Sequence, residues 1–259
     1  MTRPDVDVIG DRGPAVLVLP GGAATSRDFL PGVARELPRH RVVLYDRPGT
    51  GRNVAGGPAT FASGSAAYAE VLRDTGLGPA VVVGQSLGGA VAVQLAVDHP
   101  DLVAGLVLID PTPFNDASVC LWARRLFGVL ALPGRVPGVG ASLDRGVWRL
   151  LTMRSHLAEG EEVRASQRAL VSSASLVTTR RALDTLVADG ASLTPRLRPL
   201  ALPAVLITAD RPPSHAVRRA HDAMAAAIGA RVASWPGAVH AEQLRCPERV
   251  YDVIREVAG

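Results

Sequence analysis

The sequence predicts an α/β fold in which helices cover both faces of a mostly parallel sheet. Three observations predict it. Short apolar runs alternate with segments of helical period, a pattern typical of parallel strands joined by crossover helices. A long stretch, 111–200, has helical periodicity throughout and no convincing strand. A serine between glycines, Ser86, stands where an apolar run gives way to a helix.

The expected strands are short apolar runs rich in valine, leucine and isoleucine. Their length and their β-branched content favour buried strands over helices. They are 15–20, 41–46, 80–84, 102–110, 204–210 and 231–235.

Helices are expected in the segments between these runs. A helix over 25–38 is expected, capped by Thr25 or Ser26, because apolar residues recur along one of its faces. Gly76 is expected to end a second helix, whose last turns lie in 67–76. The other expected helices are 86–100, 215–229 and 246–259.

The long helical stretch divides the chain into a core and an insertion. Residues 1–110 and 201–259 are expected to form the core, and 111–200 a helical cap or lid. Ligands of open parallel sheets bind beyond the carboxyl ends of the strands, and the insertion leaves the sheet at that edge. A segment rich in glycine and proline, 132–140, would divide the cap into two arms. A helical excursion with no role at the site is the alternative.

Composition describes an ordinary globular protein and excludes several partners. The 259 residues are 47% hydrophobic and 20% charged. All 28 basic residues are arginine, but they are scattered among acidic residues, so no nucleic-acid partner is expected despite the net charge of +4. No apolar stretch is long enough for a membrane span, and no apolar leader opens the chain, so a cytoplasmic protein is expected. Cys120 and Cys246 indicate neither a disulfide framework nor a metal site.

The segment Gly84-Gln85-Ser86-Leu87-Gly88 matches the pattern G-x-S-x-G. A strand before it and a helix after it are the context of a nucleophile elbow, a sharp turn that exposes a serine hydroxyl. Glycines two residues away on either side remove side chains that would collide with the backbone there. The alternative is a glycine-rich turn in which Ser86 only caps the helix.

A serine nucleophile needs a base, and the chain has six histidines. His240 lies between the last expected strand and the last helix, so a parallel sheet brings it to the same edge as Ser86. The other five occupy places where a surface or structural role is expected. For the oxyanion hole, the sequence indicates the backbone N–H of Leu87 and that of Gly22, in the loop after the strand at 15–20. A flexible glycine turn is the alternative for Gly22.

These motifs together resemble the α/β-hydrolase family. The resemblance rests on PGG, YDRPGTGRN, GQSLGG, LVLIDP and GAVHAEQLRCPERV, in that order, and covers nearly the whole chain. It implies a sheet of the α/β-hydrolase type and a Ser–acid–His triad in chain order. Many relatives begin the oxyanion loop with His-Gly, where this chain has Pro20-Gly21, so the loop must be anchored differently.

The triad acid has two candidates. Most of the family place it a few residues after the strand that ends here near Thr208, where Asp210 stands directly at the strand end. Pro212 and Pro213 occupy the positions where the acid is expected. A minority place it one strand earlier, and Asp110 has that register. We favour Asp110, with Asp210 as the alternative; each could instead be a loop anchor.

The expected chemistry is acyl transfer to water from an ester or thioester of a small, largely apolar substrate. Gly21 and Gln85 are expected near the substrate, and cap residues Trp122, Phe127 and Trp148 are candidate pocket walls or parts of the cap's own core. No metal or organic cofactor is implied, and a monomer or homodimer is expected. The same fold also supports lyases, cyclases and cofactor-free peroxidases, and a ligand-binding protein is a further alternative.

Overall fold

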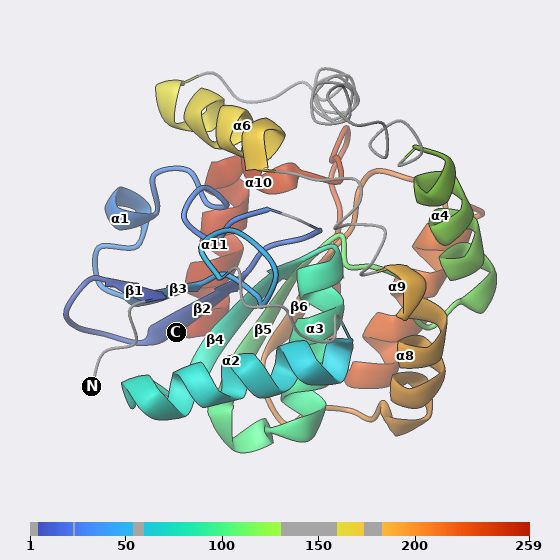
Figure 1. Cartoon of the computed structure of the whole chain (residues 1–259), viewed down its shortest axis with the longest axis horizontal. Helices are drawn as coiled ribbons and strands as arrows, with labels where there is room; N and C mark the ends of the chain where they lie inside the picture. Colours follow the sequence, from blue (N-terminus) through green and yellow to red (C-terminus); the bar gives the residue numbers. More distant parts are fainter. Residues whose placement is uncertain (1–4, 23, 54–59, 131–159, 174–182) are drawn as a thin grey trace.

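The computed structural model describes residues 5–22, 24–53, 60–130, 160–173 and 183–259. Within these residues, seven strands form one sheet in the order β1-β3-β2-β4-β5-β6-β7 (Figure 1). The strands are β1 (Val6–Ile9), β2 (Ala15–Leu19), β3 (Arg41–Tyr45), β4 (Ala80–Gln85), β5 (Val103–Ile109), β6 (Ala204–Ile207) and β7 (Arg231–Ala233).

The mostly parallel sheet that the sequence predicts is confirmed. All six expected strands are present, each within its predicted range or one residue beyond it. They pair in parallel, from β3 at one side to β7 at the other. The edge strand β1 was not expected, and it runs antiparallel to β3. It is only four residues long and leaves Val8 exposed, so its apolar pattern is too weak to identify it.

Helices cover both faces of the sheet (Figure 1). The larger buried cluster joins one face to α2 (Phe61–Thr75), α3 (Leu87–Asp98), α8 (Leu186–Leu193) and α9 (Ala216–Ile228). The second cluster joins the opposite face to α1 (Val33–Glu36) and α11 (Pro247–Ala258). The other α-helices of the described residues are α4 (Ala117–Leu130), α6 (Glu161–Ser173) and α10 (Glu242–Arg245).

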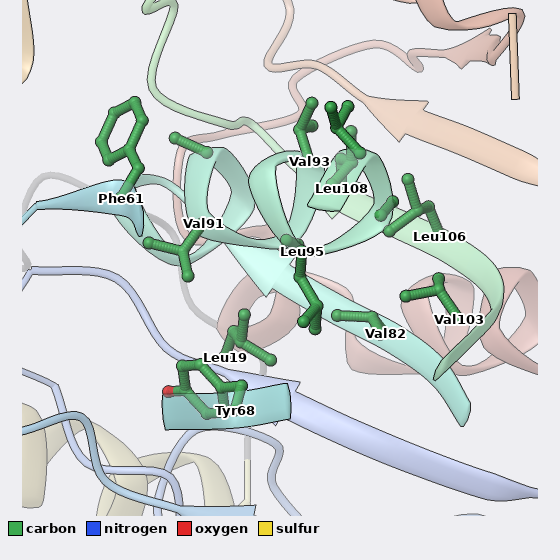
Figure 2. Packing of buried hydrophobic residues seen from close by; sticks show 14 of the residues in the cluster. Leu19, Phe61, Tyr68, Val82, Val91, Val93, Leu95, Val103, Leu106 and Leu108 are labelled. Carbon is green, nitrogen blue, oxygen red and sulfur yellow. The ribbon is translucent and has the colours of Figure 1, made fainter. Parts of the chain in front are cut away.

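The pleat of each strand divides the core between the two faces. Val82 contributes to the cluster shown in Figure 2, whereas its neighbours Val81 and Val83 contribute to the opposite one. Helix α3 is buried from Leu87 to Val97, because it packs against both the sheet and α2. This burial explains why its sequence is apolar on every side rather than along one stripe.

One predicted helix is wrong. The helix expected over 25–38 is reduced to the single turn of α1. Pro31 lacks an N–H and disfavours the helical conformation of the residue before it. Gly32 then adopts the left-handed conformation, with φ of 71°. The apolar residues that suggested a helical face are still buried; Val33 reaches the core from α1, and the others reach it from the turns on either side.

The described part of the stretch 111–200 contains α-helices and short turns and no strand. Helix α8 packs on the core: Leu186 and Leu193 are fully buried in the larger cluster, and Asp189 accepts a hydrogen bond from the Phe61 N–H at 3.2 Å. Helix α4 packs against α8. The division into a core and a cap at 111–200 stays a prediction. Among the described helices, none combines the length and the apolar character that crossing a bilayer requires.

Candidate active site

The turn from β4 into α3 has the strained geometry of a nucleophile elbow. Ser86 has φ of 51° and ψ of −118°, a conformation that non-glycine residues rarely adopt. A Cβ at Gly84 would lie 2.6 Å from the Gly88 carbonyl oxygen, and a Cβ at Gly88 would collide with the Leu19 carbonyl oxygen at the end of β2. The two glycines therefore let the turn close tightly against the neighbouring strand.

Asp110 is the other strained residue of the site. In the described chain, Ser86 and Asp110 are the two non-glycine residues with positive φ, and that of Asp110 is 42°. They follow paired strands at the same level, because Gln85 is the register partner of Ile109. Ser86 donates its N–H to Ile109 and accepts at its carbonyl from the Thr112 N–H, at 3.1 and 2.8 Å. The two strained turns are thus built as one unit.

His240 lies in the loop between β7 and α10 and reaches Asp110. Its Nδ1 is 2.6 Å from Asp110 Oδ2. A carboxylate only accepts, so Nδ1 carries a hydrogen, and in the neutral ring Nε2 is left as the acceptor. The His240 side chain is 54% exposed, whereas Asp110 is 3% exposed. The pair therefore joins a buried anion to a ring that is open to solvent.

Two carboxylates, one of them buried, hold the His240 loop. The fully buried Glu242 accepts from the Val239 N–H and from Trp235 Nε1, both at 2.7 Å. Asp210 accepts from the Gly237 N–H at 2.8 Å. Asp210, the alternative acid, therefore binds the backbone of this loop, whereas Asp110 binds the imidazole ring of His240.

The Asp110 carboxylate has several donors besides His240. Oδ1 accepts from the Ala209 N–H at 2.9 Å and from Arg211 Nη1 at 2.6 Å, and Oδ2 accepts from Arg211 Nη2 at 2.8 Å. Burial opposes ionisation of this carboxyl, but the hydrogen bonds and charges of Arg211 and His240 outweigh it. They hold the pKa of Asp110 well below its usual range. Asp110 is therefore an anion across the physiological pH range.

The loop after β2 approaches the elbow closely. A Cβ on Gly21 would lie 2.9 Å from Ser86 Cβ and would collide with Gln85 Oε1. Gly22 has φ of 46°, and its carbonyl accepts a hydrogen bond from the buried Arg47 side chain. Leu87 opens α3, where its N–H has no acceptor within the helix. The expected donors, Gly22 and Leu87, thus follow adjacent strands, β2 and β4, and their role as an oxyanion hole stays a prediction.

Gln85 makes a contact that the sequence does not predict, and its place near the substrate stays a prediction. Its side chain is buried, and Nε2 donates to the His240 carbonyl at 3.1 Å. The side chain thus ties the elbow to the histidine loop. Because Gln85 directly precedes Ser86, this hydrogen bond holds the His240 backbone close to the nucleophile elbow.

The expected pocket walls in the cap remain predictions. Trp122 lies on α4 and is 64% exposed. Phe127 lies on the same helix, but its side chain is outside the described part of the chain, as is Trp148. Among the described residues, no three His, Cys, Asp or Glu side chains gather into a possible metal site.

Four residues at the site escaped sequence reasoning in these roles: Arg211, Gln85, Arg47 and Glu242. Arg47 had a signal, since it lies in the YDRPGTGRN segment that follows β3. Glu242 lies in the segment GAVHAEQLRCPERV and binds Trp235 and Val239, which are close to it in the sequence. Arg211 and Gln85 bind partners that only the folded sheet brings near. Chemically, the arrangement supplies a buried carboxylate that orients an exposed imidazole, beside a strained serine at the topological switch point between β2 and β4.

Comparison with known proteins finds the same architecture. The sequence profile described as "alpha/beta hydrolase fold" matches residues 14–163. Lipase LipV from Mycobacterium tuberculosis is 39% identical over 109 residues, which are 42% of this chain and 42% of LipV. The chain thus matches less than half the length of this curated relative.

Solved structures match over nearly the whole chain. The candidate non-heme bromoperoxidase BpoC from Mycobacterium tuberculosis superposes with a TM-score of 0.74 at 21% identity, covering 97% of this chain and 94% of BpoC. A thermophilic esterase from Thermogutta terrifontis gives a TM-score of 0.70 at 25% identity, covering 97% of this chain and 91% of the esterase. At these identities the likeness is one of fold.

Proposed function

The chain belongs to the α/β-hydrolase fold family, and on that premise we propose that it is a serine hydrolase of carboxylic esters or thioesters. The nucleophile is Ser86, the base is His240 and the acid is Asp110. The observation that carries the proposal is the 2.6 Å hydrogen bond from His240 Nδ1 to the buried Asp110 carboxylate. That bond leaves Nε2 as the proton acceptor that a serine nucleophile requires.

The catalytic sequence follows from this arrangement. His240 Nε2 takes the Ser86 proton as the oxygen attacks the substrate carbonyl, and the N–H groups of Gly22 and Leu87 stabilise the oxyanion. His240 then gives the proton to the leaving alcohol or thiol, and an acyl-enzyme remains. Water, deprotonated by His240, attacks the acyl group, and the acid is released as Ser86 recovers its proton. Asp110 stays ionised and stabilises the imidazolium in both halves of the reaction.

The substrate is proposed to be small and largely apolar. The apolar residues of the predicted cap, among them Trp122 and Phe127, motivate this part of the proposal. The lipase and esterase names of two similar proteins also favour ester hydrolysis.

Turnover of a substrate panel in ¹⁸O-water tests the proposal. The panel contains p-nitrophenyl and thiophenyl esters of acetate, butyrate and octanoate, with Ser86→Ala as the matched control. Hydrolysis places one solvent oxygen in each acid product, and the control forms none above background. Products without solvent oxygen would move the chain to the lyases or cyclases, and binding without turnover would make it a ligand-binding protein.

A further inference from the structure

Arg211 binds the same carboxylate that His240 binds. The two terminal nitrogens of Arg211 face the two oxygens of Asp110 at 2.6 and 2.8 Å, a two-pronged ion pair. The Arg211 side chain is 21% exposed and that of Asp110 is 3% exposed, so water screens the pair only weakly. Oδ2 accepts from both Arg211 Nη2 and His240 Nδ1. One oxygen thus links a permanent cation to the imidazole.

We propose that Arg211 is a positioning residue that shares the Asp110 carboxylate with His240 and makes the imidazole a weaker base than Asp110 alone would. The inference rests on the proposed function, because it assigns Arg211 a part in the same site. It goes beyond that function by predicting how the loss of the Arg211 charge changes the pH dependence of the reaction.

The physical argument concerns charge. When His240 takes a proton, the imidazolium is stabilised by the Asp110 anion and opposed by the Arg211 cation beside it. Arg211 offsets much of the attraction between Asp110 and the imidazolium, because its positive charge nearly cancels the negative charge of Asp110. A neighbouring charge within a few ångströms shifts a titration by about 1–3 pH units, and partial exposure of Arg211 places the expected effect near the lower value.

Orientation is the second part of the role. Two parallel hydrogen bonds to Arg211 fix the plane of the carboxylate, and the Ala209 N–H adds a third contact at 2.9 Å. Oδ2 is therefore directed at His240 Nδ1 before a substrate binds. A single point charge at position 211 would keep the electrostatic effect and lose part of this alignment.

The other charged or titratable groups around the pair are already occupied. His221 Nδ1 lies 3.7 Å from Asp110 Oδ1, but burial lowers the pKa of His221, and its Nε2 donates to the Pro111 carbonyl. Asp210 and Glu242 bind backbone N–H groups of the His240 loop. On the β2 side, Arg47 binds the Gly22 carbonyl. Among the described residues, Arg211 is therefore the cation placed on the acid.

The test compares Arg211→Gln, which can keep a hydrogen bond but loses the charge, with Arg211→Lys, which keeps the charge. Arg211→Met is a second neutral variant for use if the glutamine variant does not fold. Arg231→Gln is the matched control, because it removes one positive charge from an exposed ion pair with Glu256. Two readouts are taken: the NMR titration midpoint of the His240 ring and the pH dependence of Ser86 labelling by a fluorophosphonate.

The neutral variants are expected to move the His240 midpoint and the acidic limb of labelling upward by about one pH unit. Arg211→Lys is expected to keep the midpoint close to that of the wild type, and Arg231→Gln is expected to leave the midpoint unchanged. Equal midpoints in the wild type and the neutral variants would overturn the proposal and leave Arg211 a purely structural residue, whose loss lowers rates equally at every pH. The NMR midpoint needs no reactive serine. Absence of labelling in the wild type would therefore count against the hydrolase, while the midpoint still decides the role of Arg211.

Discussion

Asp110→Asn removes the charge of the proposed triad acid while keeping its shape. Both carboxylate oxygens of Asp110 accept hydrogen bonds. In the asparagine variant an NH₂ group replaces one of these oxygens, so this group must face a donor. If the NH₂ group faces His240, the ring has to present a bare Nδ1 and place its hydrogen on Nε2, which then cannot accept the Ser86 proton. If it faces Ala209 and Arg211 Nη1 instead, two buried donors oppose it.

The expected loss of activity is taken from the same exchange in serine proteases. An Asp→Asn exchange in a serine protease triad lowers turnover about 10⁴-fold, which corresponds to about 5.5 kcal/mol of transition-state stabilisation. We expect a loss of that order in kcat/KM here. The variant also leaves the Arg211 cation without its anion, which costs about 2–3 kcal/mol of folding stability after allowance for the partial exposure of Arg211.

The assay measures kcat/KM on p-nitrophenyl butyrate at neutral pH and the urea unfolding curve of each variant. Asp210→Asn is the matched control, because its amide oxygen can still accept from the Gly237 N–H. We expect that control to lose less than about threefold. Full activity in folded Asp110→Asn, together with a large loss in Asp210→Asn, would refute the assignment of the acid.

Three further predictions concern the supports of the site. Gln85→Leu removes the hydrogen bond to the His240 carbonyl, so kcat/KM is expected to fall about tenfold and stability by about 1 kcal/mol, measured by kinetics and urea unfolding; unchanged kinetics would show that this tie does not position His240. Gly88→Ala places a Cβ against the Leu19 carbonyl oxygen and is expected to abolish fluorophosphonate labelling or folding. Gly128→Ala in α4 is expected to do neither, because among the described residues its Cβ would meet no atom within 4 Å beyond its own helix. The folded-state pKa of Asp110 is well below the ordinary 3.8, so its ionised carboxylate stabilises the fold fully above pH 3.8 and progressively less as the pH falls below 3.8. Urea midpoints between about pH 5 and 3 should therefore fall more steeply in the wild type than in Asp110→Asn. Parallel curves would contradict this prediction.

Local patterns predicted the parts of the fold that depend on neighbouring residues. The valine-rich runs identified six strands, because a strand buried on both faces must be apolar throughout. Gly76 marked the end of α2 correctly, and its φ of 65° explains the choice of glycine. The helix expected over 25–38 does not form, because Pro31 and Gly32 interrupt it despite the helical period of its apolar residues.

The elbow and the histidine could be proposed from motif and topology, but their supports could not. Asp110 and Asp210 both follow strands; the family resemblance favoured Asp110, but only the folded chain shows its carboxylate against the imidazole. The strain at Asp110 and its pairing with Arg211, 101 positions along the chain, exist only after β5 and β6 have paired. Gln85 carries no local sign that it bonds to a backbone carbonyl 155 positions away.

Covalent labelling of Ser86 tests the central claim most directly. The protein is treated with a fluorophosphonate and weighed intact, beside Ser86→Ala and His240→Ala, with circular dichroism to show that each variant is folded. A serine activated by His240 predicts one adduct on the wild type and none on either variant. An adduct that persists in Ser86→Ala, or a folded wild type that takes up no label, would contradict the claim that this chain is a serine hydrolase built on Ser86 and His240.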